Sequence, residues 1–262
     1  MGPKARYAAL YAALAGRKGH MFPWHFQWLS IYALERDLRR ILPRYKGIVL
    51  DVGCGMQPYR AWMSEAERVI GADVVKGRYV DILFDGARLP LPDASVDGML
   101  CTQVMEHVRP DDLPALCGEL ARVARPGALL VYSLPFMGHE HGAPDDYRRL
   151  TGFGAATFLP GFTTETVIRE GGIGSTIGTM LLAWWEVAST QSRFLFVVKL
   201  VTLPVFLLVS MLVNILGWLW DRLDRTERFY GDVLVVASRS PGGTGEVEAA
   251  SDNAEVTHES KE

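Results

Sequence analysis

Short, largely apolar runs recur along the chain, and most of them end at a glycine or an acidic residue. Runs without polar alternation predict strands that are buried on both faces of a parallel sheet. Between residues 28 and 42, ahead of the first run, apolar positions repeat at helical spacing. This mixture of strands and helices predicts an α/β fold, with strands near 48–50, 69–72, 80–84, 98–101, 128–134, 164–170 and 230–238.

The first predicted strand ends in Asp51 and runs into a turn that contains Gly53 and Gly55. Glycines at this point let backbone N–H groups approach a ligand that a Cβ would block. A nucleoside cofactor is usually bound at such a turn, although a tight strand-to-helix connection has the same pattern. Asp73 ends the second strand, where doubly wound folds place the acid that binds ribose hydroxyls.

Two further motifs follow in order. Residues 89–97 read Leu-Pro-Leu-Pro-Asp-Ala-Ser-Val-Asp, and Glu106 and His107 come after the fourth strand. Together these motifs resemble the class I S-adenosylmethionine-dependent methyltransferases, in the bacterial type 11-like branch with Leu-Pro-x-Pro-Asp and Glu-His segments. The resemblance covers residues 45–170 and a last strand near 230–239. It implies a Rossmann-like, seven-stranded methyltransferase sheet with helices on both faces, to which this chain adds an apolar helical insert before the last strand.

The resemblance implies that S-adenosylmethionine is the cofactor. The turn at Gly53 and Gly55 would lie against its methionine part, Asp51 would orient it, and Asp73 would hold the ribose. The chain departs from many relatives at Gln57, where they have a third glycine. The turn must therefore continue differently after Gly55.

The adenine side of the expected cofactor site lies further along the chain. The resemblance implies that Asp85 accepts a hydrogen bond from the adenine amino group and that the backbone at Gly86 meets the ring edge. Thr102 or Gln103, after the fourth strand, would line the pocket.

The loop after the fifth strand is rich in ionisable groups between residues 135 and 151. In such sheets ligands bind outside the carboxyl ends of the strands, so this loop should lie beside the cofactor. A sulfonium donor needs mainly alignment, but a hydroxyl acceptor also benefits from a base. A solvated loop with an N-capping aspartate is the alternative for each residue. The expected catalytic residues are His139, His141 and Tyr147, and the loop's expected substrate-binding residues are Asp145 and Arg148.

His107 is a further expected substrate-binding residue, which either faces the acceptor or begins the next helix; we favour the helix start. A zinc site built from His139, Glu140, His141 and Asp145 fits no structural spacing, so no metal is expected. The cysteines, Cys54, Cys101 and Cys117, form no close pair, which favours a reduced, cytoplasmic protein.

The apolar segments outside the sheet suggest a membrane. Residues 200–220 carry no charge and would reach about 31 Å as a straight helix, long enough to span a bilayer. If the strands before and after it pair in one cytoplasmic sheet, a single crossing is excluded. A helical hairpin, a segment re-entrant at Pro204, or helices in the interface remain, with anchoring tryptophans at 184, 185, 218 and 220. We favour helices that lie in or dip into one leaflet, against packing of the insert on itself or in a dimer.

The expected organisation has five parts: an N-terminal helical cap at 1–44, a cofactor-binding core at 45–172, the apolar insert at 173–229, the last strand at 230–239 and a disordered tail at 240–262. The aromatic residues at 21–28 would lie at a membrane interface or form a lid over the cofactor. The net charge of −3 gives no sign of nucleic-acid binding.

These features predict a methyltransferase at the cytoplasmic membrane face. Its acceptor would be lipid-linked, isoprenoid or otherwise amphiphilic. One alternative is a soluble small-molecule methyltransferase whose insert forms a homo-oligomer contact. Another is a catalytically silent membrane scaffold that binds S-adenosylmethionine or a nucleotide.

Overall fold

A computed structural model describes residues 2–241 of the protein. The chain forms two compact units, which are described separately. One unit contains residues 2–36, 137–139 and 170–231, and the other contains residues 37–136, 140–169 and 232–241. The expected disordered tail falls almost wholly outside the described residues.

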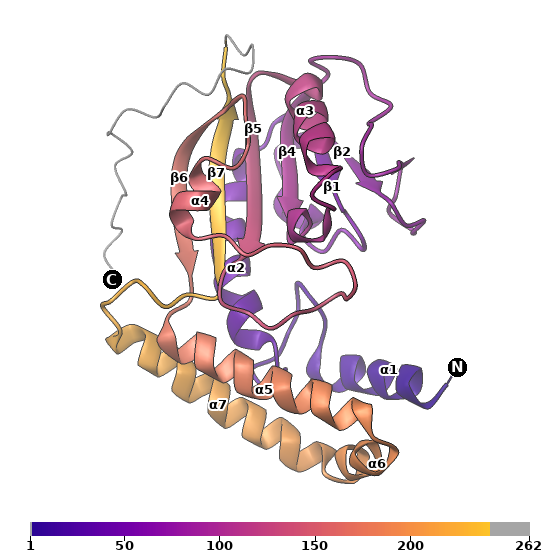
Figure 1. The fold of residues 1–262 in the computed structure, drawn as a ribbon, viewed down its shortest axis with the longest axis vertical. Coiled ribbons are helices and arrows are strands. Elements are labelled where there is room, and N and C mark those ends of the chain that lie inside the picture. The colour runs from indigo at the N-terminus through magenta and orange to yellow at the C-terminus, as the bar shows by residue number, and fades with distance from the viewer. Residues whose placement is uncertain (1, 242–262) are drawn as a thin grey trace. The chain divides into compact units, whose positions relative to one another are not determined.

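A seven-stranded sheet forms the centre of the second unit (Figure 1). The strand order is β3-β2-β1-β4-β5-β7-β6. Strands β3, β2, β1, β4 and β5 pair in parallel, and β7 pairs with β5 in the antiparallel direction. This is the expected Rossmann-like methyltransferase sheet. Its strands are β1 (Gly47–Val52), β2 (Ala66–Asp73), β3 (Ile82–Leu83), β4 (Val96–Thr102), β5 (Ala124–Pro135), β6 (Phe162–Glu170) and β7 (Asp232–Arg239).

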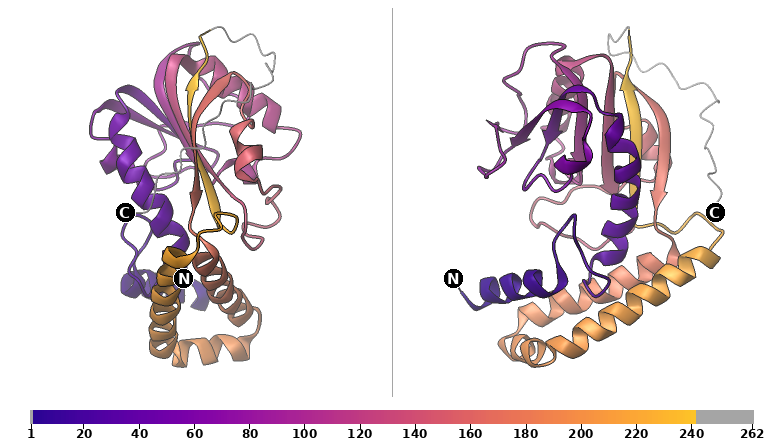
Figure 2. Two further views of the ribbon diagram at one scale, coloured as in Figure 1. Left: turned by 90° about the vertical axis from the view of Figure 1, so that its left-hand side faces the viewer. Right: turned by 180° about the vertical axis from the view of Figure 1, so that it is seen from behind.

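The central strands are buried because their apolar runs face helices on both sides. Leu50, Met99 and Leu130 have no exposed surface. Helices α3 (Leu113–Val123) and α4 (Gly152–Ala156) cover one face of the sheet, and residues 37–41 of α2 (Trp28–Ile41) lie on the other (Figure 2). The third strand is much shorter than residues 80–84 predict, since β3 has two residues.

The first unit is helical. It contains α1 (Pro3–Ala15), the first turns of α2, α5 (Ile173–Gln191), α6 (Arg193–Val201) and α7 (Leu203–Leu223). Tyr7 and Tyr11 of α1 are buried with Leu182, Leu203 and Phe206. Trp24 and Phe26, from the aromatic segment at 21–28, pack against the same cluster.

Helices α5 and α7 form a hairpin that α6 closes (Figures 1 and 2). Glycines permit close contact: a Cβ on Gly174 would lie 2.3 Å from the carbonyl oxygen of Gly217. A Cβ on Gly178 would lie 3.2 Å from a methyl group of Val213. Small residues spaced four apart are a common way for apolar helices to approach one another.

The uncharged run at 200–220 is divided between the end of α6 and most of α7. The chain turns at Thr202, between α6 and α7, and Pro204 lies in the first turn of α7. Proline is tolerated there because the first N–H groups of a helix have no partner within it. Among the helices of residues 2–241, only α7 is long and apolar enough to cross a membrane by length and composition.

Candidate functional site

The turn after β1 is held open by glycine. Gly53 and Gly55 both have positive φ angles, of 66° and 49°. A Cβ on Gly53 would lie 2.3 Å from a methyl group of Val104, whereas a Cβ on Gly55 would meet nothing within 4 Å. The first glycine is therefore required by packing. The second leaves open space beside its backbone, as a cofactor-binding turn requires.

Gln57 explains how the turn continues without a third glycine. It adopts a φ of 46°, a conformation that is uncommon for residues with a Cβ. The side chain is buried, and its Oε1 accepts a hydrogen bond from the Arg60 guanidinium at 2.9 Å. The backbone N–H of Gln57 donates to Cys54 at 2.7 Å, which closes the turn.

Asp51 and Asp73 end neighbouring strands beside this turn. Asp51 is buried, and its burial, followed by the nearby charge of Asp73, raises its pKa to about 7. The Asp73 carboxylate accepts hydrogen bonds from the backbone N–H groups of Gly55 and Val75, both at 2.9 Å. Two carboxylates and an open glycine turn therefore share one corner of the sheet, which suits a cationic ligand with hydroxyl groups.

Asp85 and Gly86 follow β3 on the surface. One oxygen of Asp85 accepts hydrogen bonds from the N–H groups of Arg88 and Ala87, at 2.8 and 2.9 Å, and these bonds lower its pKa. Gly86 has a φ of 89°, so its backbone adopts a conformation that favours glycine. Both residues lie after β3, on the side of β2 away from β1.

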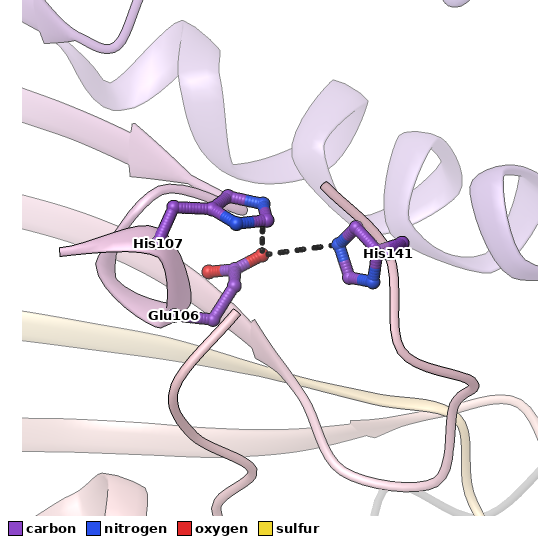
Figure 3. A group of neighbouring side chains, drawn as sticks. All are labelled: Glu106, His107 and His141. Atoms are coloured by element: carbon purple, nitrogen blue, oxygen red, sulfur yellow. Dashed lines mark ion pairs between the residues drawn. The ribbon is translucent and has the colours of Figure 1, made fainter. Parts of the chain in front are cut away.

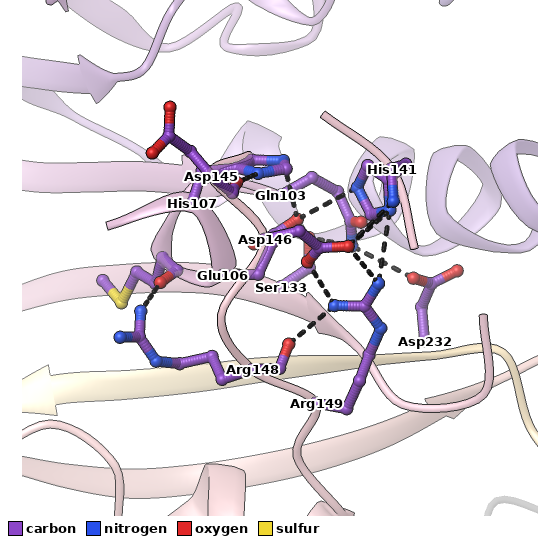
Figure 4. Close-up of polar contacts among 11 residues, drawn as sticks. Gln103, Glu106, His107, Ser133, His141, Asp145, Asp146, Arg148, Arg149 and Asp232 are labelled. Carbon is purple, nitrogen blue, oxygen red and sulfur yellow. Dashed lines mark hydrogen bonds and ion pairs between the residues drawn. The ribbon is translucent and has the colours of Figure 1, made fainter. Parts of the chain in front are cut away.

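Thr102 and Gln103 lie at the end of β4. Thr102 pairs with Ser133 on β5. Gln103 has a positive φ of 54°, and its amide nitrogen donates to Ser133 Oγ at 3.3 Å and to Asp232 Oδ1 at 3.1 Å. The Gln103 side chain thus joins the ends of β4, β5 and β7 (Figure 4).

A buried ion pair shapes the loop after β5. Asp146 binds Arg149 through both of its oxygens, at 2.5 and 2.6 Å, and this pairing holds the Asp146 pKa well below its usual range. Asp146 Oδ2 also accepts a hydrogen bond from the backbone N–H of His141 at 2.8 Å. The position of His141 is therefore fixed by Asp146 (Figure 4).

Glu106, His107 and His141 meet at the end of β4 (Figure 3). Glu106 Oε1 lies 3.7 Å from His107 Nε2 and 3.9 Å from His141 Nε2. The Glu106 side chain has no exposed surface, and burial raises its pKa to about 7. Neither of its oxygens accepts a hydrogen bond from any residue in the described part of the chain.

The structure thus brings two of the expected residues, His107 and His141, to a carboxylate that the sequence analysis quoted without giving it a role. Glu106 could have been singled out because it is an acid directly before a histidine at a strand end. His107 does not begin the next helix, as we had favoured. It lies in a separate 3-10 turn, η3 (Met105–His107), whereas α3 begins at Leu113.

The other expected loop residues bind the backbone around this turn or each other. Arg148 donates to the carbonyl oxygen of Met105, and the backbone N–H of Tyr147 donates to the backbone carbonyl oxygen of Glu106 at 2.8 Å. The Tyr147 hydroxyl donates to Asp145 Oδ1 at 2.8 Å and is exposed. His139 is half-buried and lies outside the Glu106 cluster. These contacts leave the assigned catalytic and binding roles as predictions.

Comparison with known proteins identifies the domain that runs from within β1 to within β5. Residues 50–132 match the family model described as a methyltransferase domain. These residues form a methyltransferase domain of the class I, S-adenosylmethionine-dependent type. The fold agrees, since this chain superposes on a S-adenosylmethionine-dependent methyltransferase from Archaeoglobus fulgidus with a TM-score of 0.50 and 16% identity. That match covers 89% of this chain and 99% of the other.

Curated relatives are similar over part of the methyltransferase. A malonyl-[acyl-carrier protein] O-methyltransferase from Serratia marcescens is 30% identical over 115 residues, which cover 40% of this chain and 44% of that protein. A probable S-adenosylmethionine-dependent methyltransferase from Mycolicibacterium smegmatis is 42% identical over 99 residues, which cover 33% and 37%. The matched region spans less than half the length of each of these relatives.

The same fold also occurs in a protein described as the [4+2]-cyclase SpnF, with a TM-score of 0.52 and 18% identity over 82% of this chain and 83% of that chain. Such a likeness shows the fold alone. The cofactor is S-adenosylmethionine. The residues at the turn fit this group. Gly55 leaves space beside its backbone, and Asp51 and Asp73, near the ends of β1 and β2, offer negative charge to the sulfonium and hydrogen-bond acceptors to the ribose hydroxyls.

Proposed function

We propose that the protein transfers a methyl group from S-adenosylmethionine to a lipid-linked, isoprenoid or otherwise amphiphilic acceptor at the cytoplasmic face of a membrane. The cofactor supplies a methyl group that is already activated for displacement. The chain's own residues then have to hold the acceptor and keep water away. Gly53, Gly55, Asp51 and Asp73 are proposed to bind the cofactor. Asp85 and Gly86 are proposed to lie at its adenine side, and Thr102 or Gln103 to line the pocket after β4.

The observation that carries the membrane part is the apolar surface of the helical unit. Along α7, Leu208, Leu212 and Leu216 are 53%, 50% and 64% exposed and recur at four-residue spacing. Comparable exposed residues continue onto α5 and α6, at Leu181, Trp184, Phe194, Val197 and Val201. A soluble monomer rarely exposes so much contiguous apolar surface.

Charge is almost absent from this surface. Residues 173–220, all of which the structure describes, contain three charged residues: Glu186, Arg193 and Lys199. Lys199 is fully buried against Glu186, and Arg193 is exposed at the start of α6. A surface of this kind suits the acyl region of a bilayer leaflet.

The path of the chain argues against a single crossing. The backbone N–H of Gly231 donates to the backbone carbonyl oxygen of Glu170 at 3.0 Å. These two residues lie where the chain leaves β6 for the hairpin and where it returns to β7. Strands β6 and β7 are neighbours in one sheet. A hairpin that starts and ends at the same sheet can dip into a leaflet without moving either strand across the membrane. Trp184 and Trp220 are exposed at 67% and 50% and are the proposed interfacial anchors, whereas Trp185 packs inside the unit.

An acyl-carrying acceptor is consistent with the Serratia relative, whose name describes O-methylation of a malonyl group on an acyl-carrier protein. His139, His141 and Tyr147 are the proposed catalytic candidates, with His107, Asp145 and Arg148 on the acceptor side. The soluble alternative assigns the exposed helices to contacts between copies of the chain.

The test supplies purified protein with S-adenosylmethionine labelled in its methyl group, together with either a membrane lipid extract or the matching water-soluble extract. We expect label in a product that partitions into organic solvent. Label confined to water-soluble products would favour the soluble alternative. Absence of labelled product from both extracts, with cofactor binding intact, would favour the silent scaffold.

A flotation assay tests the membrane surface separately. We expect the wild-type protein to float with vesicles of anionic and neutral phospholipid, and Leu216→Glu to reduce the floating fraction. Ala115→Glu is the matched control, since it places the same charge at an exposed position on α3. Equal flotation of both variants would contradict insertion of α7.

A further inference from the structure

We propose that Glu106, His107 and His141 bind a divalent transition-metal ion, Zn²⁺ or a close analogue. The sequence spacing gave no reason to expect a metal, because these three residues come from two separated segments. The fold brings one donor atom from each into a group whose members all lie within 4.8 Å of one another (Figure 3).

The buried carboxylate of Glu106 favours a bound cation. Glu106 has no exposed surface, and within residues 2–241 neither oxygen accepts a hydrogen bond. Burying a carboxylate without hydrogen bonds is costly unless an opposite charge lies against it. Glu106 Oε1 lies 3.7 and 3.9 Å from the Nε2 atoms of His107 and His141, which is too far for hydrogen bonds.

The tautomer of His107 also favours a metal ion, because it leaves Nε2 free to bind one. Its Nδ1 lies 2.5 Å from the carbonyl oxygen of Asp145. A carbonyl oxygen can only accept, so Nδ1 carries the hydrogen, and in a neutral ring Nε2 then has a free lone pair. Two lone-pair donors, Nε2 and Glu106 Oε1, therefore face each other. A histidine whose second nitrogen donates to a backbone carbonyl is the usual arrangement around a bound metal.

The backbone of the loop after β5 holds His141 beside Glu106 and His107. Gly142 has a φ of 70°, and a Cβ there would lie 2.9 Å from Cε1 of His107. The backbone N–H of His141 donates a hydrogen bond to the Asp146 carboxylate at 2.8 Å, which holds this part of the loop in place. The Nδ1 atom of His141 lies 3.7 Å from the Asp146 carboxylate and 3.4 Å from the Arg149 guanidinium, which can only donate. Metal binding through Nε2 therefore requires the tautomer in which Nδ1 carries the hydrogen and donates to Asp146 instead.

The donor set defines the ion. Two imidazoles and one carboxylate suit Zn²⁺, Co²⁺ or Fe²⁺ and leave coordination positions open. Bonds of about 2.1 Å in tetrahedral geometry put the donors about 3.4 Å apart. The observed separations from Glu106 require closure by a few tenths of an ångström, which rotation of the half-exposed histidine rings can supply.

An open position at this ion could hold an oxygen atom of the acceptor and lower its pKa. This role rests on the proposed function, because it assumes that the acceptor binds at the end of β4. Metal binding itself does not, and the experiment measures binding alone.

The experiment uses the untagged full chain, stripped with a chelator and then titrated with Zn²⁺ by calorimetry and with Co²⁺ by visible absorption, without cofactor or acceptor. We expect about one equivalent bound per chain and a Co²⁺ spectrum of low coordination number. Glu106→Gln and His141→Asn should each weaken binding by at least about tenfold. His139→Asn, in the same loop but outside the cluster, should bind as the wild type does.

Circular dichroism and thermal melting check that the variants fold. His141 is partly exposed, so His141→Asn keeps the test decisive if Glu106→Gln unfolds. Binding of less than a stoichiometric amount by the wild type, or equal binding by the wild type and His141→Asn, would overturn the proposal. Loss of methyl transfer with metal binding intact would instead count against the proposed function.

Discussion

Asp51 is the penultimate residue of β1 and Asp73 is the last residue of its parallel neighbour β2, and burial of Asp51 together with the charge of Asp73 raises the pKa of Asp51 to about 7. A carboxyl group of this kind is half neutral near physiological pH. It becomes fully charged only when a cation compensates it or when the pH rises.

Cofactor affinity should therefore increase with pH. The cationic sulfonium donor favours ionised Asp51, so binding is linked to loss of a proton below pH 7. We expect the dissociation constant for S-adenosylmethionine to fall by up to about tenfold per pH unit between pH 5.5 and 7 and to level off above pH 7.5. Calorimetry across this range in the wild type and in Asp51→Asn is the measurement. The same slope in both proteins would show that another group is responsible.

Asp51 should also cost stability at high pH. Its folded pKa lies above the unfolded value of 3.8, so the native state holds the proton more tightly. The resulting stabilisation is complete below pH 3.8 and is lost as the pH rises through 7. Asp51→Asn has no such pH-dependent loss. The free energy of unfolding of the variant minus that of the wild type should therefore increase by about 1–3 kcal/mol between pH 5.5 and pH 8. Urea denaturation at both pH values checks this, and a difference that shrinks with pH would contradict it.

The two glycines of the turn should fail in different ways. Gly53→Ala pushes a Cβ into Val104 and should lower the melting temperature, and the added substitution Val104→Ala should restore part of it. Gly55→Ala meets open space, so its cost is the left-handed backbone, about 1–2 kcal/mol. We expect Gly55→Ala to remain folded and to lose cofactor binding by more than about tenfold. Normal binding by folded Gly55→Ala would move the cofactor away from this turn.

The hairpin should depend on one buried ion pair. Lys199 Nζ lies 2.6 Å from Glu186 Oε1 and 4.3 Å from the centre of the Tyr7 ring. Lys199→Met leaves the carboxylate uncompensated and should destabilise the protein by about 3–5 kcal/mol. In Lys199→Met/Glu186→Gln the charge is removed as well, so the loss should be smaller. A double variant as unstable as the sum of the single variants would show that the two side chains act independently.

The strand ends could be predicted from the sequence because their cause is local. Apolar runs that end at Asp51 and Asp73 mark both the buried strand and the edge where it stops. The two-residue length of β3 could not be read from residues 80–84, because pairing with β2 sets it. A kink at Pro204 was one of the open alternatives, but the exact break at Thr202 could not be located, since an uncharged run has the same composition whether it is one helix or two.

The site was predicted less completely for a related reason. His107 and His141 were expected from their types and from the loop that contains His141, but their common partner was not. Glu106 acquires its environment from burial behind the end of β4 and from a loop that returns more than thirty residues later, which no local pattern encodes. His139 satisfied the same local pattern as His141, and no local feature of the sequence distinguishes the two.

The most direct test of this account is binding of S-adenosylmethionine by the purified protein, followed by transfer of its labelled methyl group to a membrane lipid extract. We predict saturable binding by the wild-type protein that Asp73→Ala abolishes. We also predict that label appears in an organic-soluble product with the wild-type protein and not with Asp73→Ala. Undiminished binding by Asp73→Ala, or label that stays in the aqueous phase, would contradict it.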